Sequence, residues 1–246
     1  MKASFVRYSP LLLLAVIWEL VSRFELVSAS VLPSLSAVGK AWEKLALDPE
    51  FWLNGADSLY RGAAGLALAI VIGGGLGIFM AWSRGFQMVM NPLVEVLYPL
   101  PKSALIPVTA LWLGFGDASK ILLIFLGCML PVTLGAYNGA RGTEHTLKWS
   151  ALSLGASPLR MLRDVIVPSA LPEMLNGIRT ALATSFVLLV SAEMIASRSG
   201  FGYLIGFLGD TGAYPEMFAV VLTVSFLGFA VDRLYQFSVD RTMQWR

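Results

Sequence analysis

Residues 118–138 read Ala-Ser-Lys-Ile-Leu-Leu-Ile-Phe-Leu-Gly-Cys-Met-Leu-Pro-Val-Thr-Leu-Gly-Ala-Tyr-Asn, and Lys120 is the one charged residue among them. The length matches the ~20 apolar residues that a helix needs to cross a hydrocarbon layer about 30 Å thick. The spacing lacks the strict alternation of a membrane strand, so a helix is indicated. Five more stretches have a similar length, at 9–27, 62–82, 92–113, 174–196 and 215–236. We therefore expect an all-α integral membrane protein with about six transmembrane helices, forming a single domain over residues 1–246.

The bulk composition supports the same fold class. Of the 246 residues, 57% are hydrophobic and only 14% are charged, and the mean hydropathy is +0.71, whereas about a quarter of the residues in a soluble domain are charged. The net charge of +2 is too small to indicate a nucleic-acid partner. With one cysteine and one histidine, an intrachain disulfide is impossible, and a metal-dependent membrane enzyme is disfavoured.

Basic residues between the apolar stretches indicate the orientation of the chain. If the N-terminus is cytoplasmic, the inner segments hold ten Lys and Arg residues against five in the outer segments, so we expect both termini in the cytoplasm. Lys2 and Arg7 before the first stretch would also suit a signal peptide, but no small-x-small cleavage site follows directly, which favours a retained span. The five outer cations in this assignment are Lys40, Lys44, Arg61, Lys120 and Arg198.

The inner connection that follows the quoted stretch holds the most informative segment, residues 141–168. We expect two short helices there, separated by Gly155. Thr143 is a suitable N-cap for the first helix, and Gly155 would end it in a left-handed conformation. An apolar face of this helix, at helical spacing, is formed by Leu147, Ala151 and Leu154.

The second helix of this loop would begin at Ser157 as N-cap with Pro158 at the first helical position. Pro168 would end it. Its apolar face is formed by Leu159, Leu162 and Ile166. Such helices either lie at the membrane surface or dock into a cleft on a soluble partner.

This loop resembles the cytoplasmic signature loop of ABC importer permeases. The family pattern runs Glu-Ala-Ala, three residues, Gly, nine residues and Ile-x-Leu-Pro, and Ala151, Gly155 and Pro168 stand at the family spacing. The phrase Ser153-Leu-Gly-Ala-Ser-Pro is similar to one branch, the permeases for sulfonates, taurine, nitrate and related small solutes. The conservative matches are Val165 and Val167, and the departures are Trp149 and Ser150, which replace Glu and Ala.

Other elements resemble the same branch in the same order, so the resemblance covers nearly the whole chain. These elements are Leu32-Pro33-Ser34, the run from Pro99 to Gly116, the run from Leu171 to Arg179, and Ala192-Glu193-Met194.

The resemblance implies a type I ABC importer permease bundle with a cytoplasmic coupling helix, in a bacterial inner membrane. Such permeases usually pair as two copies, and we expect a homodimer here. Each copy docks its loop helix on an ATP-hydrolysing subunit. A periplasmic or lipid-anchored solute-binding protein delivers the solute. The coupling residues that the resemblance implies are Ala151, Leu154, Gly155, Ala156, Ser157, Arg160 and Pro168.

The chain itself has no Gly-x-x-x-x-Gly-Lys-Ser/Thr phosphate loop. Gly73-Gly74-Gly75 lacks the lysine and is better suited to close helix packing. The resemblance therefore assigns ATP and Mg²⁺ to the partner ATPase, and this non-catalytic chain is expected to hold no cofactor or metal of its own.

Polar groups inside the spans are candidates for the solute pathway, because a charge at mid-membrane costs about 2.5–3.5 kcal/mol on insertion scales. Lys102 follows Pro99 and Pro101, which break a helix, and broken backbone at that depth is tolerated mainly beside protein or a water-filled cavity. Alternatively, residues 92–102 lie at the cytoplasmic surface and Lys102 is solvated. The other candidates are Tyr98, Asn138 and Glu193.

Besides Lys102, three charged residues in the spans have expected partners or positions. Glu193 would line an outer gate or pair with a cation such as Arg198. Arg179 would extend its charged end towards the interface, and Glu19 would hydrogen-bond a neighbouring helix. Two segments are expected at the outer face, residues 28–61 as an outer connection and residues 200–214 as a re-entrant or interfacial element.

Competing functions remain open. A membrane enzyme would need a catalytic pair or metal set, and none has characteristic spacing here. A passive channel would not need a capped loop helix. Within the transport function, a sulfonate, taurine or nitrate is the expected solute, and a vitamin, a thiamine precursor or an aromatic acid is the alternative.

Overall fold

The computed structural model describes residues 2–243, with side chains from residue 9 onward. Within this range the chain forms helices and turns and no strand, which confirms the all-α prediction. A 3-10 turn, η1 (Lys102–Leu105), precedes α5, and a π turn, η2 (Leu162–Ile166), joins α8 to α9. The α-helices are α1 (Lys2–Arg23), α2 (Leu35–Ala46), α3 (Pro49–Trp82), α4 (Arg84–Leu97), α5 (Ile106–Leu113), α6 (Asp117–Arg141), α7 (His145–Ser153), α8 (Pro158–Met161), α9 (Val167–Ala196), α10 (Phe201–Asp210) and α11 (Tyr214–Thr242).

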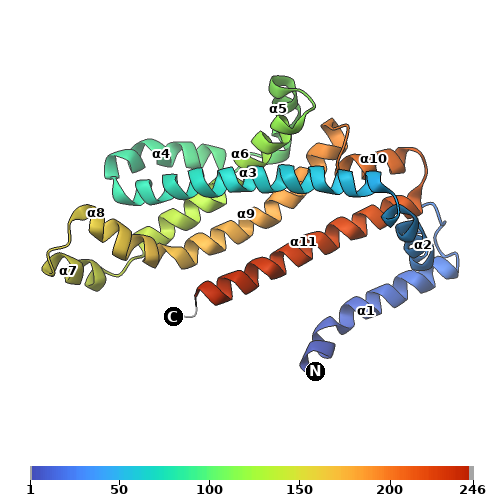
Figure 1. The fold of residues 1–246 in the computed structure, drawn as a ribbon, viewed down its shortest axis with the longest axis horizontal. Coiled ribbons are helices and arrows are strands. Elements are labelled where there is room, and N and C mark those ends of the chain that lie inside the picture. The colour runs from blue at the N-terminus through green and yellow to red at the C-terminus, as the bar shows by residue number, and fades with distance from the viewer. Residues whose placement is uncertain (1, 244–246) are drawn as a thin grey trace.

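Helices α3, α6 and α9 form the centre of the bundle and pack against one another (Figure 1). A Cβ atom on Gly73 of α3 would lie 2.8 Å from the Met129 carbonyl oxygen of α6, and one on Gly177 of α9 would lie 2.5 Å from the Pro131 carbonyl oxygen. Glycines at these contacts let the helix backbones approach closely. The packing role expected of the three-glycine run is confirmed at Gly73, whereas Gly75 faces open space.

Four helical segments of the described residues are long and apolar enough to cross a membrane: α3, α6, the continuous 39-residue helix Pro158–Ala196, and α11. The pair Arg84–Leu97 and Lys102–Leu113 makes a fifth if it counts as one span, but its two parts meet at 92°. The apolar stretch 92–113 is therefore not one straight helix. Pro99 and Pro101 explain the break, because proline lacks the N–H that would continue the helical hydrogen bonds.

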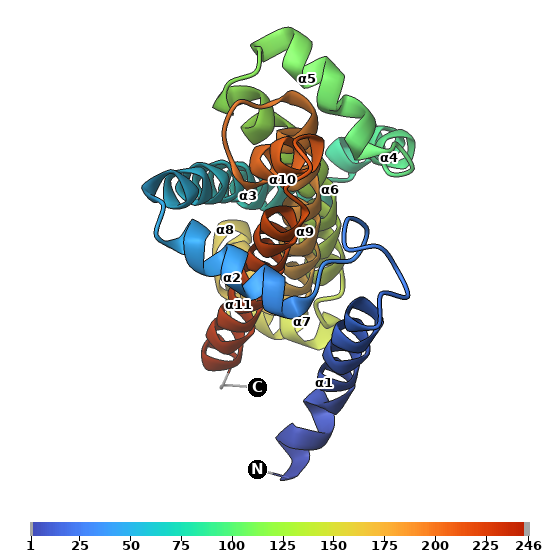
Figure 2. The same cartoon turned by 90° about the vertical axis from the view of Figure 1, so that its right-hand side faces the viewer.

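Helix α1 carries the first apolar stretch and stands apart from the bundle, as Figure 1 and Figure 2 both show. Leu11–Leu14 are exposed on it. The helix is fastened near its C-terminal end, where Trp18 Nε1 donates to the Pro33 carbonyl at 2.8 Å and a Glu19 carboxylate oxygen accepts from the Leu35 amide at 2.7 Å. Since Leu35 begins α2, the prediction that Glu19 bonds a neighbouring helix is confirmed.

The segment 28–61, expected to be an outer connection, folds instead into α2 and the beginning of α3. Local signals account for both helices. The Ser34 hydroxyl caps α2 by accepting from the Ala37 amide at 3.2 Å, and Asp48 caps α3 ahead of Pro49. Two of the five cations assigned to outer connections therefore lie elsewhere: Arg61 is inside α3 and Lys120 is inside α6, and both are buried.

The two ends of the bundle differ in structure. One end, which we call the loop end, carries α7 and α8, and the other, which we call the far end, carries α2 and α10 (Figure 1). Residues 200–214 form α10 and a short turn, and Phe201, Ile205 and Val220 pack together there in an apolar cluster. Because Pro158–Ala196 is one continuous helix, it connects the two ends directly.

Candidate functional site

The loop end is built around a glycine turn between α7 and α8. Gly155 has φ +73°, its amide donates to the Leu152 carbonyl at 2.9 Å, and the Ala156 amide donates to the Ala151 carbonyl at 3.0 Å. These two bonds are the pair that defines a Schellman cap. The left-handed cap expected at Gly155 is confirmed.

The start of the second loop helix also matches its prediction. The Ser157 hydroxyl accepts from the Arg160 amide at 3.4 Å, and Pro158 stands in the first turn of α8. The N-cap expected for the first helix is wrong, because Glu144 holds that position. Thr143 is buried and its hydroxyl donates instead to the Ala140 carbonyl at 3.0 Å, which closes the end of α6.

Pro168 does not end the second helix, contrary to the expectation. Helix α8 continues through η2 into α9, and Pro168 stands in the first turn of α9. A π turn has wider i to i+5 hydrogen bonding, and here it ends two residues before Pro168, which could not donate a bond of its own. The loop helix and the membrane helix are consequently parts of one helical segment.

The surface of the loop is apolar and exposed. The Leu154 side chain is 83% exposed and the Trp149 side chain 71% exposed. By contrast, Ile166 is buried with Ala140 and Ala170, between the ends of α6 and α9. The loop is therefore anchored on its inner side, while its exposed apolar residues are Leu147, Trp149, Leu152, Leu154 and Leu159.

The four candidate pathway residues do not form one cluster. Lys102 and Tyr98 lie together, because Lys102 Nζ donates to the Tyr98 carbonyl at 2.5 Å and to the Leu97 carbonyl at 3.0 Å. Asn138 is exposed near the loop end of α6, whereas Glu193 is fully buried near the far end of α9. Lys102 lies beside the middle of α6. A Cβ atom added to Gly127, which is midway along that helix, would lie 3.6 Å from Lys102 Cγ.

Glu193 belongs to a buried polar network at the far end, and its cation is Arg61 rather than Arg198. Arg61 Nη1 donates to Glu193 Oε1 at 2.8 Å, and Arg61 Nε donates to Asp117 Oδ1 at 2.7 Å. Glu193 also accepts from the Ser58 hydroxyl at 2.7 Å and from the Gly202 amide at 3.0 Å. The sequence prediction missed this network because it placed Arg61 in a connection.

A second buried cation lies beside this network. Lys120 Nζ donates to the Phe115 carbonyl at 2.5 Å and to the Ala196 carbonyl. Ala196 is the last residue of α9, so the ammonium group closes the C-terminus of that helix, where a positive charge is favourable. A sequence signal could have placed Arg61 on α3. Asn54, Ser58 and Arg61 recur at helical spacing after the N-cap residue Asp48, which predicts that they share one face of a helix.

Arg179 pairs with an acidic residue of α11, while its extension towards the membrane interface stays a prediction. Its guanidinium bonds both carboxylate oxygens of Asp232 in α11, with Nε–Oδ1 2.9 Å and Nη2–Oδ2 3.2 Å. The Tyr235 hydroxyl donates nearby to the Leu175 carbonyl at 2.8 Å. These bonds attach α11 to the loop-end half of α9.

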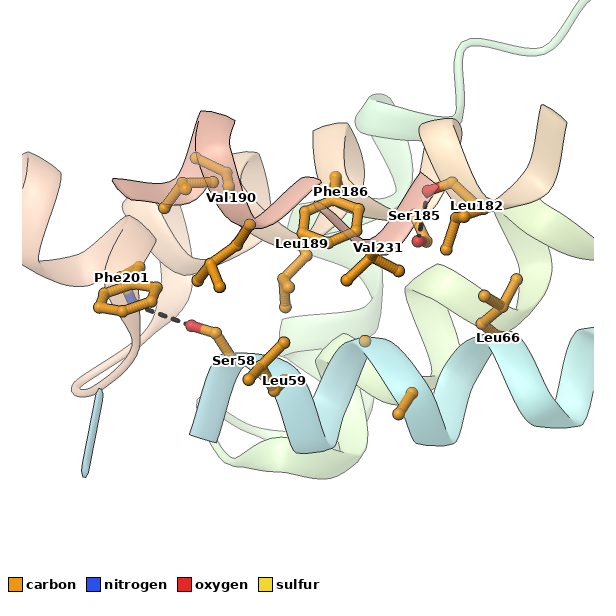
Figure 3. A pocket seen from close by; sticks show the side chains of 14 residues that line it. Ser58, Leu59, Leu66, Leu182, Ser185, Phe186, Leu189, Val190, Phe201 and Val231 are labelled. Atoms are coloured by element: carbon orange, nitrogen blue, oxygen red, sulfur yellow. Dashed lines mark hydrogen bonds between the residues drawn. The ribbon is translucent and has the colours of Figure 1, made fainter. Parts of the chain in front are cut away.

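A cavity of about 260 Å³ lies between α3, α9 and α11 (Figure 3). Its wall is apolar, with Phe186 among the side chains that line it. The two lining hydroxyls are used within the chain, since Ser58 bonds Glu193 and Ser185 donates to the Leu182 carbonyl at 2.7 Å. The cavity therefore presents hydrocarbon rather than polar groups, and it does not suit a small anionic solute.

Comparison with known proteins identifies the family. A family model described as the binding-protein-dependent transport system inner membrane component matches residues 73–244. The chain belongs to this family. This permease is 33% identical over 230 residues to SsuC of Bacillus subtilis (strain 168), a permease named for aliphatic sulfonate transport, with 94% of this chain and 83% of SsuC covered. It is 32% identical to the taurine transport system permease protein TauC of Escherichia coli (strain K12), with 90% and 82% covered.

The fold agrees with the family. The permease superimposes on a chain of the MetNI methionine ABC transporter, solved in inward-facing conformations, with TM-score 0.62, 21% identity, and 80% and 97% of the two chains covered. The predicted type I importer bundle is therefore confirmed. This permease is the non-catalytic transmembrane subunit of an ATP-driven importer, and the family implies an ATPase subunit and a solute-binding protein as partners. Among the described residues no group of His, Cys, Asp and Glu could hold a metal ion.

Proposed function

We propose that the permease imports a small anionic or polar solute, such as a sulfonate, taurine or nitrate, and that its loop couples transport to ATP hydrolysis. The names of SsuC and TauC support the solute class. A vitamin, a thiamine precursor or an aromatic acid is the second candidate. The partner ATPase, in two copies, would bind ATP and Mg²⁺, and a periplasmic or lipid-anchored binding protein would deliver the solute.

The observation that carries the coupling proposal is the exposed apolar surface on a rigid, capped loop. Exposure of Leu154 to water is unfavourable, because burial of a leucine side chain lowers the free energy by about 1.5–3 kcal/mol. A groove on a partner subunit would supply that burial. Since α8 continues into α9, motion of the groove would reach the membrane helix. The proposed coupling residues are Ala151, Leu154, Gly155, Ala156, Ser157, Arg160 and Pro168.

We further propose that two copies of the permease form a homodimer in the bacterial inner membrane, with both termini and the loop end in the cytoplasm. The burial of Arg61 and Lys120 inside the bundle supports this orientation. It leaves Lys40, Lys44 and Arg198 as the cations assigned to the outer side, so the excess of basic residues on the inner side becomes larger.

The break between α4 and η1 is the proposed lining of the solute path. It places an ammonium group, Lys102, at the depth of Gly127, which is midway along α6. Irregular backbone and charge at that depth are tolerated beside a water-filled cavity or another protein. Tyr98, on the same break, is exposed and would face the path with Lys102. Asn138, at the loop end, is the third candidate, whereas Glu193 is buried too completely to touch solute.

The coupling proposal is tested by Leu154→Asp with Leu47→Asp as the matched control. The two leucines are 83% and 82% exposed and lie at opposite ends of the bundle. Loss of an apolar interface anchor costs more than about 1 kcal/mol, so we expect Leu154→Asp to weaken ATPase binding by about fivefold or more, and Leu47→Asp to leave it unchanged. Co-purification in mild detergent measures the binding.

The solute is identified in the same complex after reconstitution with the cognate binding protein. Taurine, an alkanesulfonate and nitrate are compared with a vitamin and an aromatic acid for stimulation of ATP hydrolysis. Unchanged ATPase binding by the Leu154→Asp variant would refute the coupling proposal. Stimulation by the vitamin or the aromatic acid alone would refute the assignment to a sulfonate, taurine or nitrate.

A further inference from the structure

The turn between α9 and α10, residues 197–200, is fastened to one face of α3. Asn54 Oδ1 accepts from the Gly200 amide at 2.6 Å, and the Ser58 hydroxyl accepts from the Phe201 amide at 2.8 Å. Arg61 Nη1 donates to the Ser199 carbonyl at 2.8 Å. The three α3 residues recur at helical spacing, so one face of α3 holds the last two residues of the turn and the first residue of α10.

Helix α6 is joined to the same network. Arg61 bridges the carboxylates of Asp117, at the start of α6, and Glu193, in the last turns of α9. Lys120 of α6 bonds the last carbonyl of α9. The far ends of α3, α6 and α9 and the start of α10 are thus linked by side chains of which Arg61, Lys120 and Glu193 are buried.

The network is complete, which makes each member hard to replace. Every buried side-chain N and O atom among the described residues has a hydrogen-bond partner. Complete buried networks hold one geometry, but removing one charged partner leaves the other buried and uncompensated. Arginine is suited to the central position because its planar fork can bond two carboxylates and a carbonyl at once, which lysine cannot do.

The loop end shows the opposite character. Its apolar residues are exposed, and its connection to α9 passes through the π turn η2. One continuous helix, Pro158–Ala196, runs from that exposed surface to the buried network. A displacement at α8 would therefore arrive at the Arg61–Glu193 pair.

We propose that Arg61 and Glu193 are positioning residues, which make the far ends of α3, α6, α9 and α10 move as one body when the loop is displaced. This inference rests on the proposed coupling function of the loop. Without the pair, α9 would still move, but the turn at residues 197–200 would no longer carry α3 and α10 with it. Transport would then lose its connection to ATP hydrolysis at the far end.

The test uses Glu193→Gln, which keeps the side-chain size and removes the charge, with Glu43→Gln on the exposed surface of α2 as the control. Cys128 is the single cysteine and is buried, so new surface cysteines can be labelled selectively. Spin labels are placed at Phe207→Cys on α10 and, as a reference, at Trp149→Cys on α7. We expect Glu193→Gln to increase the mobility of the α10 label and to leave the α7 label unchanged.

In the reconstituted complex with the ATPase and binding protein, the same variant should lose the stimulation of ATP hydrolysis by solute, while Glu43→Gln keeps it. If Glu193→Gln fails to fold, Arg61→Lys serves with the same readouts, because it retains the charge but not the fork. An unchanged α10 label overturns the proposal, and so does a mobile α10 label with stimulation intact. A wild-type chain that binds no ATPase refutes the proposed function instead, and this outcome is recognised before any variant is compared.

Discussion

The Gly200→Ala substitution is expected to lower the free energy of unfolding for two separate structural reasons. Gly200 has φ +110° and ψ 163°, a region of backbone conformation that is essentially restricted to glycine and costs about 1–3 kcal/mol for other residues. A Cβ atom there would also fall well inside 3.0 Å of the Glu193 carboxylate. Crowding in a packed interior costs about 1–3 kcal/mol more, so the expected loss in the free energy of unfolding is about 2–6 kcal/mol.

Gly114→Ala is the matched control for this substitution. Gly114 has φ 75° and ψ −170°, in the same glycine-restricted region, but a Cβ atom there would have no atom within 4 Å. The control therefore carries the backbone cost alone, and the difference between the two variants, about 1–3 kcal/mol, isolates the crowding of Glu193. Denaturant unfolding in detergent micelles, followed by tryptophan fluorescence, measures both. Equal destabilisation would show that the carboxylate is not packed against the turn.

Two other regions of the bundle give comparable tests. Gly77→Ala would place a Cβ atom against the backbone of α6, whereas the Cβ atom of Gly75→Ala would meet open space. The first substitution should therefore lower the free energy of unfolding by about 1–3 kcal/mol, and the second should not. A Gly77→Ala variant as stable as the wild type would contradict the close packing of α3 on α6. Arg179→Asp and Asp232→Arg should each lower the melting temperature by placing like charges together, and the double variant should recover most of the loss. A double variant no more stable than the worse single one would argue against the pair.

The caps of the loop were predictable because they depend on neighbouring residues alone. A glycine after an amphipathic run, followed by Ser157-Pro158, specifies a Schellman cap and a helix start by local hydrogen bonding. Thr143 was assigned wrongly because its hydroxyl donates to the Ala140 carbonyl at the end of α6, and α7 begins only after Glu144.

The buried charges were not predictable in the same way. The sequence prediction counted Arg61 and Lys120 as outer cations, because both stand near the end of an apolar stretch, where a charged residue is usually solvated. Asp57 and Phe115 are near in sequence, but Asp117, Glu193 and Ala196 lie more than fifty residues from the cations that they bind. The helical spacing on α3 could therefore place Arg61 on that helix but could not name these distant partners. The same reason explains Arg179, whose partner Asp232 lies 53 residues further along the chain.

The π turn at η2 has a consequence for the direction in which the loop surface points. An α-helix advances by about 100° for each residue, and a π turn accommodates one residue more than an α turn. The angular phase of α8 relative to α9 is consequently offset by this extra residue. Gain or loss of one residue at residues 162–166 would re-aim Leu159 and Arg160 around the helix axis while leaving the contacts of α3, α6 and α9 in place. Such a step would let related permeases fit differently shaped ATPase grooves on an unchanged membrane scaffold.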